Sequence, residues 1–94
     1  KKGKYCWTFG PNYETPAEIN FFRSFGGDSV GMSTVPEVEF ASKLDMNILV
    51  ISALTNFAAG ISDKLLTHEE VLFNANKIQN NFTKLLLGII NNIN

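Results

Sequence analysis

The sequence predicts an α/β fold, and three observations support that prediction. Strand-like segments at 3–9, 28–32 and 47–54 are each followed by a segment with helical apolar spacing. The last of these strands is apolar throughout, as is typical of a strand buried on both faces of a parallel sheet. Finally, a Thr-x-x-Glu sequence opens each helical segment. This alternation favours parallel strands linked by crossover helices.

The first half of the chain supplies two strands and one helix. The stretch "GKYCWTF" at 3–9 predicts an aromatic-rich strand bounded by glycines. Residues 16–25 predict a helix with two apolar stripes, so we expect most of its circumference to be buried, and Gly26 and Gly27 end it. Residues 28–32 predict a short second strand.

The second half continues the same order. Residues 35–44 predict a helix with one apolar face, formed by Val38, Ala41 and Leu44. The apolar strand 47–54 is expected to be central in its sheet, and 55–63 is expected to be a loop. Residues 68–90 predict a long helix whose apolar positions alternate steps of four and three, giving one continuous buried stripe. The stripe consists of Val71, Ala75, Ile78, Phe82, Leu85 and Ile89.

Composition and charge narrow the function classes. A chain of 94 residues with a net charge of −1 predicts one small globular domain without an internal boundary. This near-neutral balance of charge does not indicate binding to nucleic acid or to an anionic membrane. The apolar runs are too short to cross a bilayer. The single cysteine, Cys6, leaves no internal disulfide and favours a reducing cytoplasmic location. Because the first residue is Lys1, we expect the chain to begin part-way through a longer protein.

Three capping boxes are predicted, with Thr15, Thr34 and Thr67 as the N-caps. Such boxes commonly do no more than stop helices from fraying. In an open α/β sheet, however, the junction between a strand end and the next helix lies at the carboxyl edge, where ligands bind. Helix N-termini at that edge also favour anions.

Side chains with binding chemistry flank these junctions. Each also has an ordinary structural interpretation, as an exposed turn residue, a secondary cap, a surface imidazole or core packing, and the residues alone leave both open. The candidates are Tyr13, Glu14, Met32, Ser33, Asn56 and His68.

Four stretches together resemble a known family. "GPNYETPAE", "GMSTVPEVEFA", "SALTNFAAGIS" and "THEEVL" closely resemble, in order, the C-terminal part of trimeric purine nucleoside phosphorylases acting on inosine and guanosine. The resemblance implies a phosphorylase-type fold with a mixed central sheet flanked by helices, of which residues 1–94 are the C-terminal portion, roughly the final third. It implies reversible phosphorolysis of 6-oxopurine (deoxy)ribonucleosides to free base and ribose 1-phosphate. Orthophosphate would be a co-substrate, with no cofactor or metal, in a cytoplasmic homotrimer.

The resemblance also implies roles for individual residues in base recognition. Tyr13 matches an aromatic placed against the purine, and Glu14 matches the carboxylate that accepts from the base N1–H and the exocyclic amine of guanine. Asn56, following Thr55 in the same substrate-binding stretch, matches the amide that faces purine N7 and O6. An amide donor there stabilises the negative charge that the leaving purine gains in the transition state.

The sugar and phosphate roles follow in the same way. Met32 matches a residue lying against the ribose, Ser33 a hydroxyl that binds phosphate, and His68 the imidazole that contacts the ribose 5′-hydroxyl. Glu14, Asn56 and His68 are thus the implied catalytic residues. The family's Gly-rich phosphate loop and its other phosphate ligands have no counterpart here, so residues 1–94 alone are expected to be inactive.

Two alternatives remain at this point. A methylthioadenosine phosphorylase resembles this stretch, but carries Asp at the position of Asn56 and lacks the Tyr-Glu-Thr-Pro run. A non-catalytic interaction module could instead present the helix 68–90, whose four-three spacing resembles a coiled-coil seam. That second interpretation leaves four candidates unexplained: Glu14, Ser33, Asn56 and His68.

Overall fold

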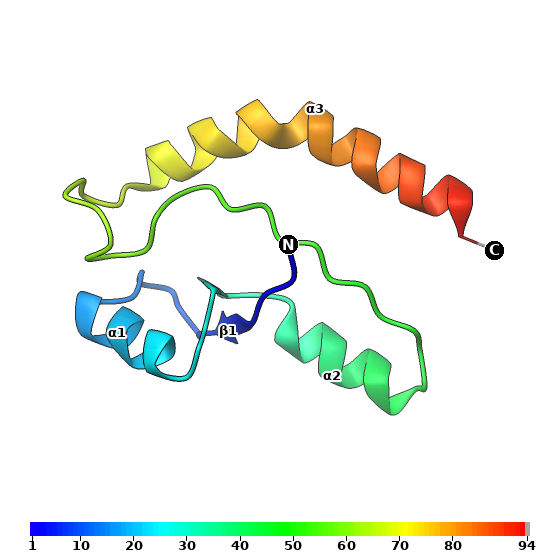
Figure 1. The fold of residues 1–94 in the computed structure, drawn as a ribbon, viewed down its shortest axis with the longest axis horizontal. Helices are drawn as coiled ribbons and strands as arrows, with labels where there is room; N and C mark the ends of the chain where they lie inside the picture. The colour runs from blue at the N-terminus through cyan, green and yellow to red at the C-terminus, as the bar shows by residue number, and fades with distance from the viewer. Residues whose placement is uncertain (94) are drawn as a thin grey trace.

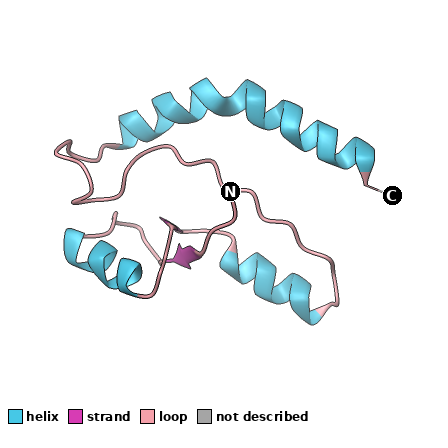
Figure 2. Cartoon of the chain, viewed as in Figure 1, coloured by secondary structure: helices cyan, strands magenta, loops and turns pink. Residues whose placement is uncertain are grey.

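The computed structural model describes residues 1–93, so the last position of the predicted domain 1–94 lies outside the described residues. The strands and helices alternate in the first half of the chain, as the α/β class requires (Figure 1, Figure 2). In chain order they are β1 (Tyr5–Trp7), α1 (Pro16–Ser24), β2 (Ser29–Gly31), α2 (Val35–Lys43) and α3 (His68–Asn92).

The sheet consists of β1 and β2, which pair in parallel and are linked by α1. Cys6 lies opposite Val30 in the register. Two further hydrogen bonds extend the pairing beyond the strands: Lys4 N donates to Asp28 Oδ2 at 2.8 Å, and Thr8 N donates to the Gly31 carbonyl at 3.0 Å. The predicted crossover arrangement is therefore confirmed for these two strands.

The predicted strand 47–54 is wrong. Residues 47–54 form an extended segment without strand pairing, which runs back between α3 and the part of the molecule that holds the sheet (Figure 1). Ile48, Leu49 and Val50 are 42%, 69% and 44% exposed. A strand forms only where its backbone N–H and C=O groups pair with a neighbour, and residues 1–93 provide none for this segment.

Helix α1 buries less of its surface than expected. Ile19 is buried at 4% exposure and Phe22 is half-buried, so one stripe of the helix is covered. Phe21 and Phe25 are exposed and stack edge to face on each other, with ring centroids 4.9 Å apart. The expectation that most of the helix circumference is buried is wrong, because the second stripe has no neighbour within residues 1–93.

The other two helices are also only partly covered. In α2, Val38 and Ala41 are half-buried, whereas Leu44 is exposed just beyond the helix. The stripe on α3 is half-buried at five of its six positions but exposed at Leu85, so the continuous buried stripe is wrong. The extended segment contributes Ala53 to a small hollow against α3, lined by Ala75, Ile78 and Phe82 among others.

Residues 1–93 do not close a hydrophobic core of their own. Ile19 is the one buried apolar side chain among them. The radius of gyration is 15.0 Å, compared with roughly 12 Å for a compact domain of this length. Large apolar side chains thus remain exposed on α1, on the extended segment and on α3.

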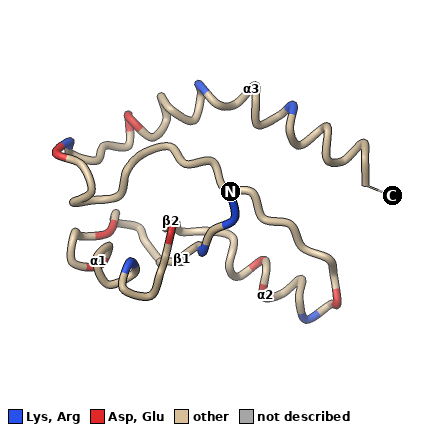
Figure 3. The backbone as a smooth tube through the Cα atoms, in the orientation of Figure 1, with Lys and Arg blue, Asp and Glu red and all other residues tan. Residues whose placement is uncertain are grey.

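Charge is spread thinly over the described chain, and acidic and basic residues are interspersed (Figure 3). Within residues 1–93, none of the helices is both long enough and apolar enough to cross a membrane. Across the same residues, His, Cys, Asp and Glu side chains nowhere gather in the groups of three that a metal ion would need.

Candidate functional site

The loop from β1 to α1, residues 8–15, forms the wall of a pocket. Gly10 adopts φ +68° and precedes Pro11 through a cis peptide bond. The positive φ favours glycine there, and Met32 lies so close that a Cβ at Gly10 would be 2.6 Å from its Sδ. The loop therefore turns sharply and packs against the end of β2.

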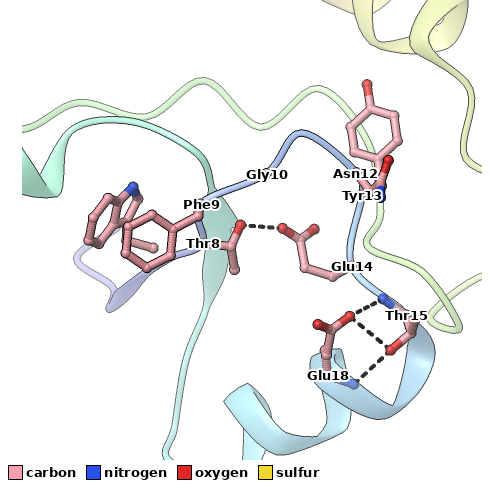
Figure 4. A pocket seen from close by; sticks show the side chains of 9 residues that line it. Thr8, Phe9, Gly10, Asn12, Tyr13, Glu14, Thr15 and Glu18 are labelled. Carbon is pink, nitrogen blue, oxygen red and sulfur yellow. Dashed lines mark hydrogen bonds between the residues drawn. The ribbon is translucent and has the colours of Figure 1, made fainter.

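The pocket has a volume of about 550 Å³ and combines aromatic rings with two carboxylates, Glu14 and Glu18, of which Glu18 is bonded to the Thr15 cap (Figure 4). Trp7 and Phe9 lie together on one side, with ring centroids 4.5 Å apart. The side chain of Glu14 is half-buried in the pocket. Aromatic rings beside a carboxylate acceptor that no cap occupies, Glu14, suit a planar heteroaromatic ring that carries N–H donors. Its principal lining residues are Trp7, Thr8, Phe9, Tyr13, Glu14 and Thr15.

Glu14 is held by a hydroxyl from the end of β1. Thr8 Oγ1 donates to Glu14 Oε1 at 2.6 Å, and Figure 4 shows the two side chains pointing toward each other across the loop. A short hydrogen bond to a charged acceptor of this kind is among the stronger ones in proteins. The carboxylate is thereby fixed in the pocket rather than left to rotate in solvent.

The first predicted capping box is confirmed directly beside Glu14. Thr15 Oγ1 accepts from Glu18 N at 3.3 Å, while Thr15 N donates to Glu18 Oε2 at 2.6 Å. Thr15 Oγ1 also donates to Glu18 Oε2 at 2.9 Å, and the two hydrogen bonds that the carboxyl accepts, from the Thr15 backbone first and its hydroxyl second, lower the pKa of Glu18. The cap fixes the start of α1, and so the position of Glu14 one residue before it.

Tyr13 links this pocket to the start of α3. Its hydroxyl lies 3.2 Å from His68 Nδ1, although the two residues are 55 positions apart in the sequence. In Figure 4 the tyrosine side chain points away from the loop, toward the helix at the top of the view. At α3, the Thr67 hydroxyl accepts from Glu70 N at 3.2 Å, which is half of the third predicted box.

The second predicted capping box is wrong. Thr34 has φ +81° and ψ −51°, and Val35 N donates to the Ser33 carbonyl at 2.9 Å, which together define a γ-turn. In this conformation the Thr34 hydroxyl lies 3.1 Å from Ser33 Oγ instead of capping α2. A β-branched residue at positive φ costs about 1–3 kcal/mol, and strain of this kind clusters at functional sites.

The remaining candidates lie on the loop before α3. Thr55 Oγ1 donates to Asn56 Oδ1 at 2.7 Å, and Asn56 Nδ2 donates to the Phe57 carbonyl at 3.0 Å. Asn74 of α3 fixes this turn by donating to the Thr55 carbonyl at 2.7 Å. Both candidate side chains are half-buried.

The structure thus unites part of the predicted set. Tyr13 and Glu14 line the pocket, His68 contacts Tyr13, and Met32 packs on the pocket loop at Gly10. Ser33, Thr55 and Asn56 are not among the lining residues.

Sequence reasoning missed Thr8 as a neighbour of Glu14. The sequence placed Thr8 inside the predicted strand 3–9, whereas β1 ends at Trp7, so only the structure shows Thr8 at the carboxyl edge.

The sequence of the chain matches a family model and several known proteins. The family model of the phosphorylase superfamily matches residues 1–91. The chain is 49% identical over 90 residues to "Purine nucleoside phosphorylase 1" of Bacillus subtilis, covering 96% of this chain and 33% of that protein. It is 44% identical over 89 residues to "6-oxopurine nucleoside phosphorylase" of Pyrococcus furiosus, covering 95% and 34%.

A further match has a different nucleoside in its name. The chain is 49% identical over 67 residues to "Probable S-methyl-5'-thioinosine phosphorylase" of Methanopyrus kandleri, covering 71% of this chain and 26% of that protein. The chain therefore spans about a third of the length of the first two relatives and about a quarter of this one.

Proposed function

Since the chain belongs to the phosphorylase superfamily, as its motifs predicted, we propose that it carries the base-reading part of a 6-oxopurine nucleoside phosphorylase. The reaction is the reversible phosphorolysis of inosine, guanosine and their deoxy forms. A phosphate oxygen attacks C1′, the bond from C1′ to N9 breaks, and the proton of hydrogen phosphate ends on the purine. The products are the free base and (deoxy)ribose 1-phosphate.

One observation carries the proposal: the Glu14 carboxylate lies in an aromatic pocket and is oriented by Thr8. Hypoxanthine and guanine carry a hydrogen on N1, and guanine adds an exocyclic amine. An ionised carboxylate accepts both and donates nothing, so it matches these bases. Adenine presents a lone pair at N1 and meets the same carboxylate with repulsion. The named activities of the relatives point to the same base class.

The other predicted residues supply positioning and transition-state charge. We assign the Asn56 amide to purine N7 and O6, where negative charge gathers as the glycosidic bond breaks. For this role the amide must exchange its present bond to the Phe57 carbonyl for the purine. The Thr55 hydroxyl donates to Asn56 Oδ1, and Asn74 anchors the Thr55 carbonyl.

At the other end of the nucleoside, we assign Met32 to the ribose and Ser33 to orthophosphate. The strained turn at Thr34 supports a functional role for this junction. His68 is assigned to the ribose 5′ group. The 5′-methylthio nucleoside named for the Methanopyrus relative has the same type of base, so it is the second candidate substrate, and the His68 contact is what would separate the two.

We propose further that the enzyme uses orthophosphate as its co-substrate without a cofactor, and acts as a cytoplasmic homotrimer. The motif resemblance and the single cysteine support these points. The apolar surfaces left open on α1 and α3 are compatible with burial by more of the phosphorylase domain.

The proposal is tested on the natural-length protein by product analysis. Inosine incubated with phosphate should yield hypoxanthine and ribose 1-phosphate, and omission of phosphate should stop the reaction. Glu14→Gln should lower kcat/KM for inosine by about tenfold or more, because the amide replaces an acceptor by a donor. Glu39→Gln, an exposed carboxylate on α2, is the matched control. Release of free ribose, or activity without phosphate, would contradict phosphorolysis.

A further inference from the structure

We propose that Thr8 is a positioning residue that sets base specificity, by holding Glu14 through one carboxylate oxygen and leaving the other for the purine. The inference rests on the proposed function, and it concerns a residue that the motif resemblance leaves without a role. It makes the discrimination between 6-oxopurines and 6-aminopurines a property of the Thr8–Glu14 pair.

Thr8 is attached to the sheet on one side and to the pocket on the other. Its backbone N donates to the Gly31 carbonyl of β2 at 3.0 Å, so the residue continues the strand pairing beyond Trp7. Its hydroxyl donates to Glu14 Oε1 at 2.6 Å, and both side chains are half-buried in the pocket wall. A group positioned by a strand is held more precisely than one that only a loop supports.

Glu14, by contrast, lies in the loop between β1 and the cap of α1. A glutamate side chain has several rotatable bonds, and ordering them when a ligand arrives weakens binding. The hydrogen bond from Thr8 orders the Glu14 side chain before the base binds, so less conformational entropy is lost on binding. It occupies Oε1, which leaves Oε2 with its lone pairs free to accept from the purine N1–H.

The direction of the Thr8 bond also matters. Because Thr8 donates to Oε1, the other carboxylate oxygen stays available as an acceptor. That oxygen can accept from N1–H of hypoxanthine or guanine, whereas adenine has a lone pair at N1 and gains nothing from it. Loss of the Thr8 hydroxyl should therefore weaken 6-oxopurine binding more than adenosine binding, and so reduce the discrimination between the two.

The test uses the natural-length protein with three variants. Thr8→Val keeps the shape and removes the hydroxyl, Thr8→Ser keeps the hydroxyl, and Thr83→Val is a matched control on the exposed side of α3. Thr8→Val should raise KM for inosine about tenfold, the usual size of one hydrogen bond to a charged group, and leave kcat within about twofold. The ratio of kcat/KM for inosine to that for adenosine should fall with it. Thr8→Ser should restore both quantities.

Several results would overturn the inference while leaving the proposed function intact. In each case the wild type is active. The first result is a KM for inosine that Thr8→Val leaves unchanged. The others are equal losses of kcat/KM in Thr8→Val and Thr8→Ser, or a fall of kcat without a change of KM in Thr8→Val. Thermal melts accompany each variant, and if Thr8→Val does not fold, Thr8→Ala compared with Thr8→Ser carries the same test. A wild type that does not cleave inosine at all would instead refute the proposed function, and with it this inference.

Discussion

Residues 1–94 in isolation are expected to show no sharp cooperative melt and no phosphorolysis. The accessible surface is 7991 Å², about 2,600 Å² more than a compact protein of this size exposes. Over half of a protein surface is apolar, so at about 25 cal/mol per Å² the missing burial amounts to several tens of kcal/mol. Net stabilities of domains are only about 5–15 kcal/mol, so this shortfall decides the outcome.

A single substitution in the extended segment, residues 47–54, tests the same argument from missing burial. Val50 is 44% exposed here, although its neighbours in the sequence have the pattern of a strand buried on both faces. If the rest of a phosphorylase domain covers this segment, Val50→Asp in the natural-length protein should lower the free energy of unfolding by about 3 kcal/mol or more, because a carboxylate would then be buried. Ser62→Asp, on an exposed loop, adds the same group as the control.

Urea denaturation of the natural-length variants, together with a thermal melt and a coupled phosphorolysis assay of residues 1–94, measures both effects. A sharp melt of the isolated monomer, or turnover above the blank, would refute the argument from missing burial. So would a Val50→Asp variant whose unfolding free energy lies within about 0.5 kcal/mol of the wild type, the range of ordinary surface substitutions.

Three further predictions concern single side chains. Asn56→Asp should lower kcat/KM for inosine by about 10²–10³ and shift preference toward adenosine, because it removes a donor aimed at the developing charge; an unchanged preference would reject this role. His68→Ala should reduce turnover of inosine about tenfold more than that of 5′-deoxyinosine, and equal losses would place His68 elsewhere. The pKa of Glu18 is lowered in the folded protein, so its capping hydrogen bonds stabilise the fold at neutral pH. This contribution to the free energy of unfolding is lost as the pH falls below the unfolded pKa of about 4.3. Urea unfolding of wild type and Glu18→Gln should therefore converge in acid, and a gap that persists there argues against the cap.

The helix starts were predictable because their causes are local. All three helices begin at the predicted residues, Pro16, Val35 and His68. A preceding threonine with a glutamate three residues later indicates each boundary, and α1 and α2 add a proline in the first turn. The parallel pairing of β1 and β2 also followed from the alternation of elements.

What the sequence did not predict depends on distant partners or on backbone geometry. Residues 47–54 have the composition of a central strand, but pairing requires neighbours that residues 1–93 do not contain. The Thr34 sequence fits a capping box, yet its positive φ turns the hydroxyl elsewhere. The same limit applies to the site: Glu14 was indicated by its motif, whereas its partner Thr8 lies six residues earlier and became visible only in the folded loop.

The most direct test of the central claim is base specificity in the natural-length protein. Specificity constants for inosine, guanosine and adenosine should be measured in phosphate with one preparation. The account predicts kcat/KM values for inosine and guanosine at least about a hundredfold above that for adenosine, because the Glu14 carboxylate accepts from N1–H and has no donor for adenine. An adenosine value equal to or above that for inosine would contradict the assignment of this pocket to 6-oxopurines.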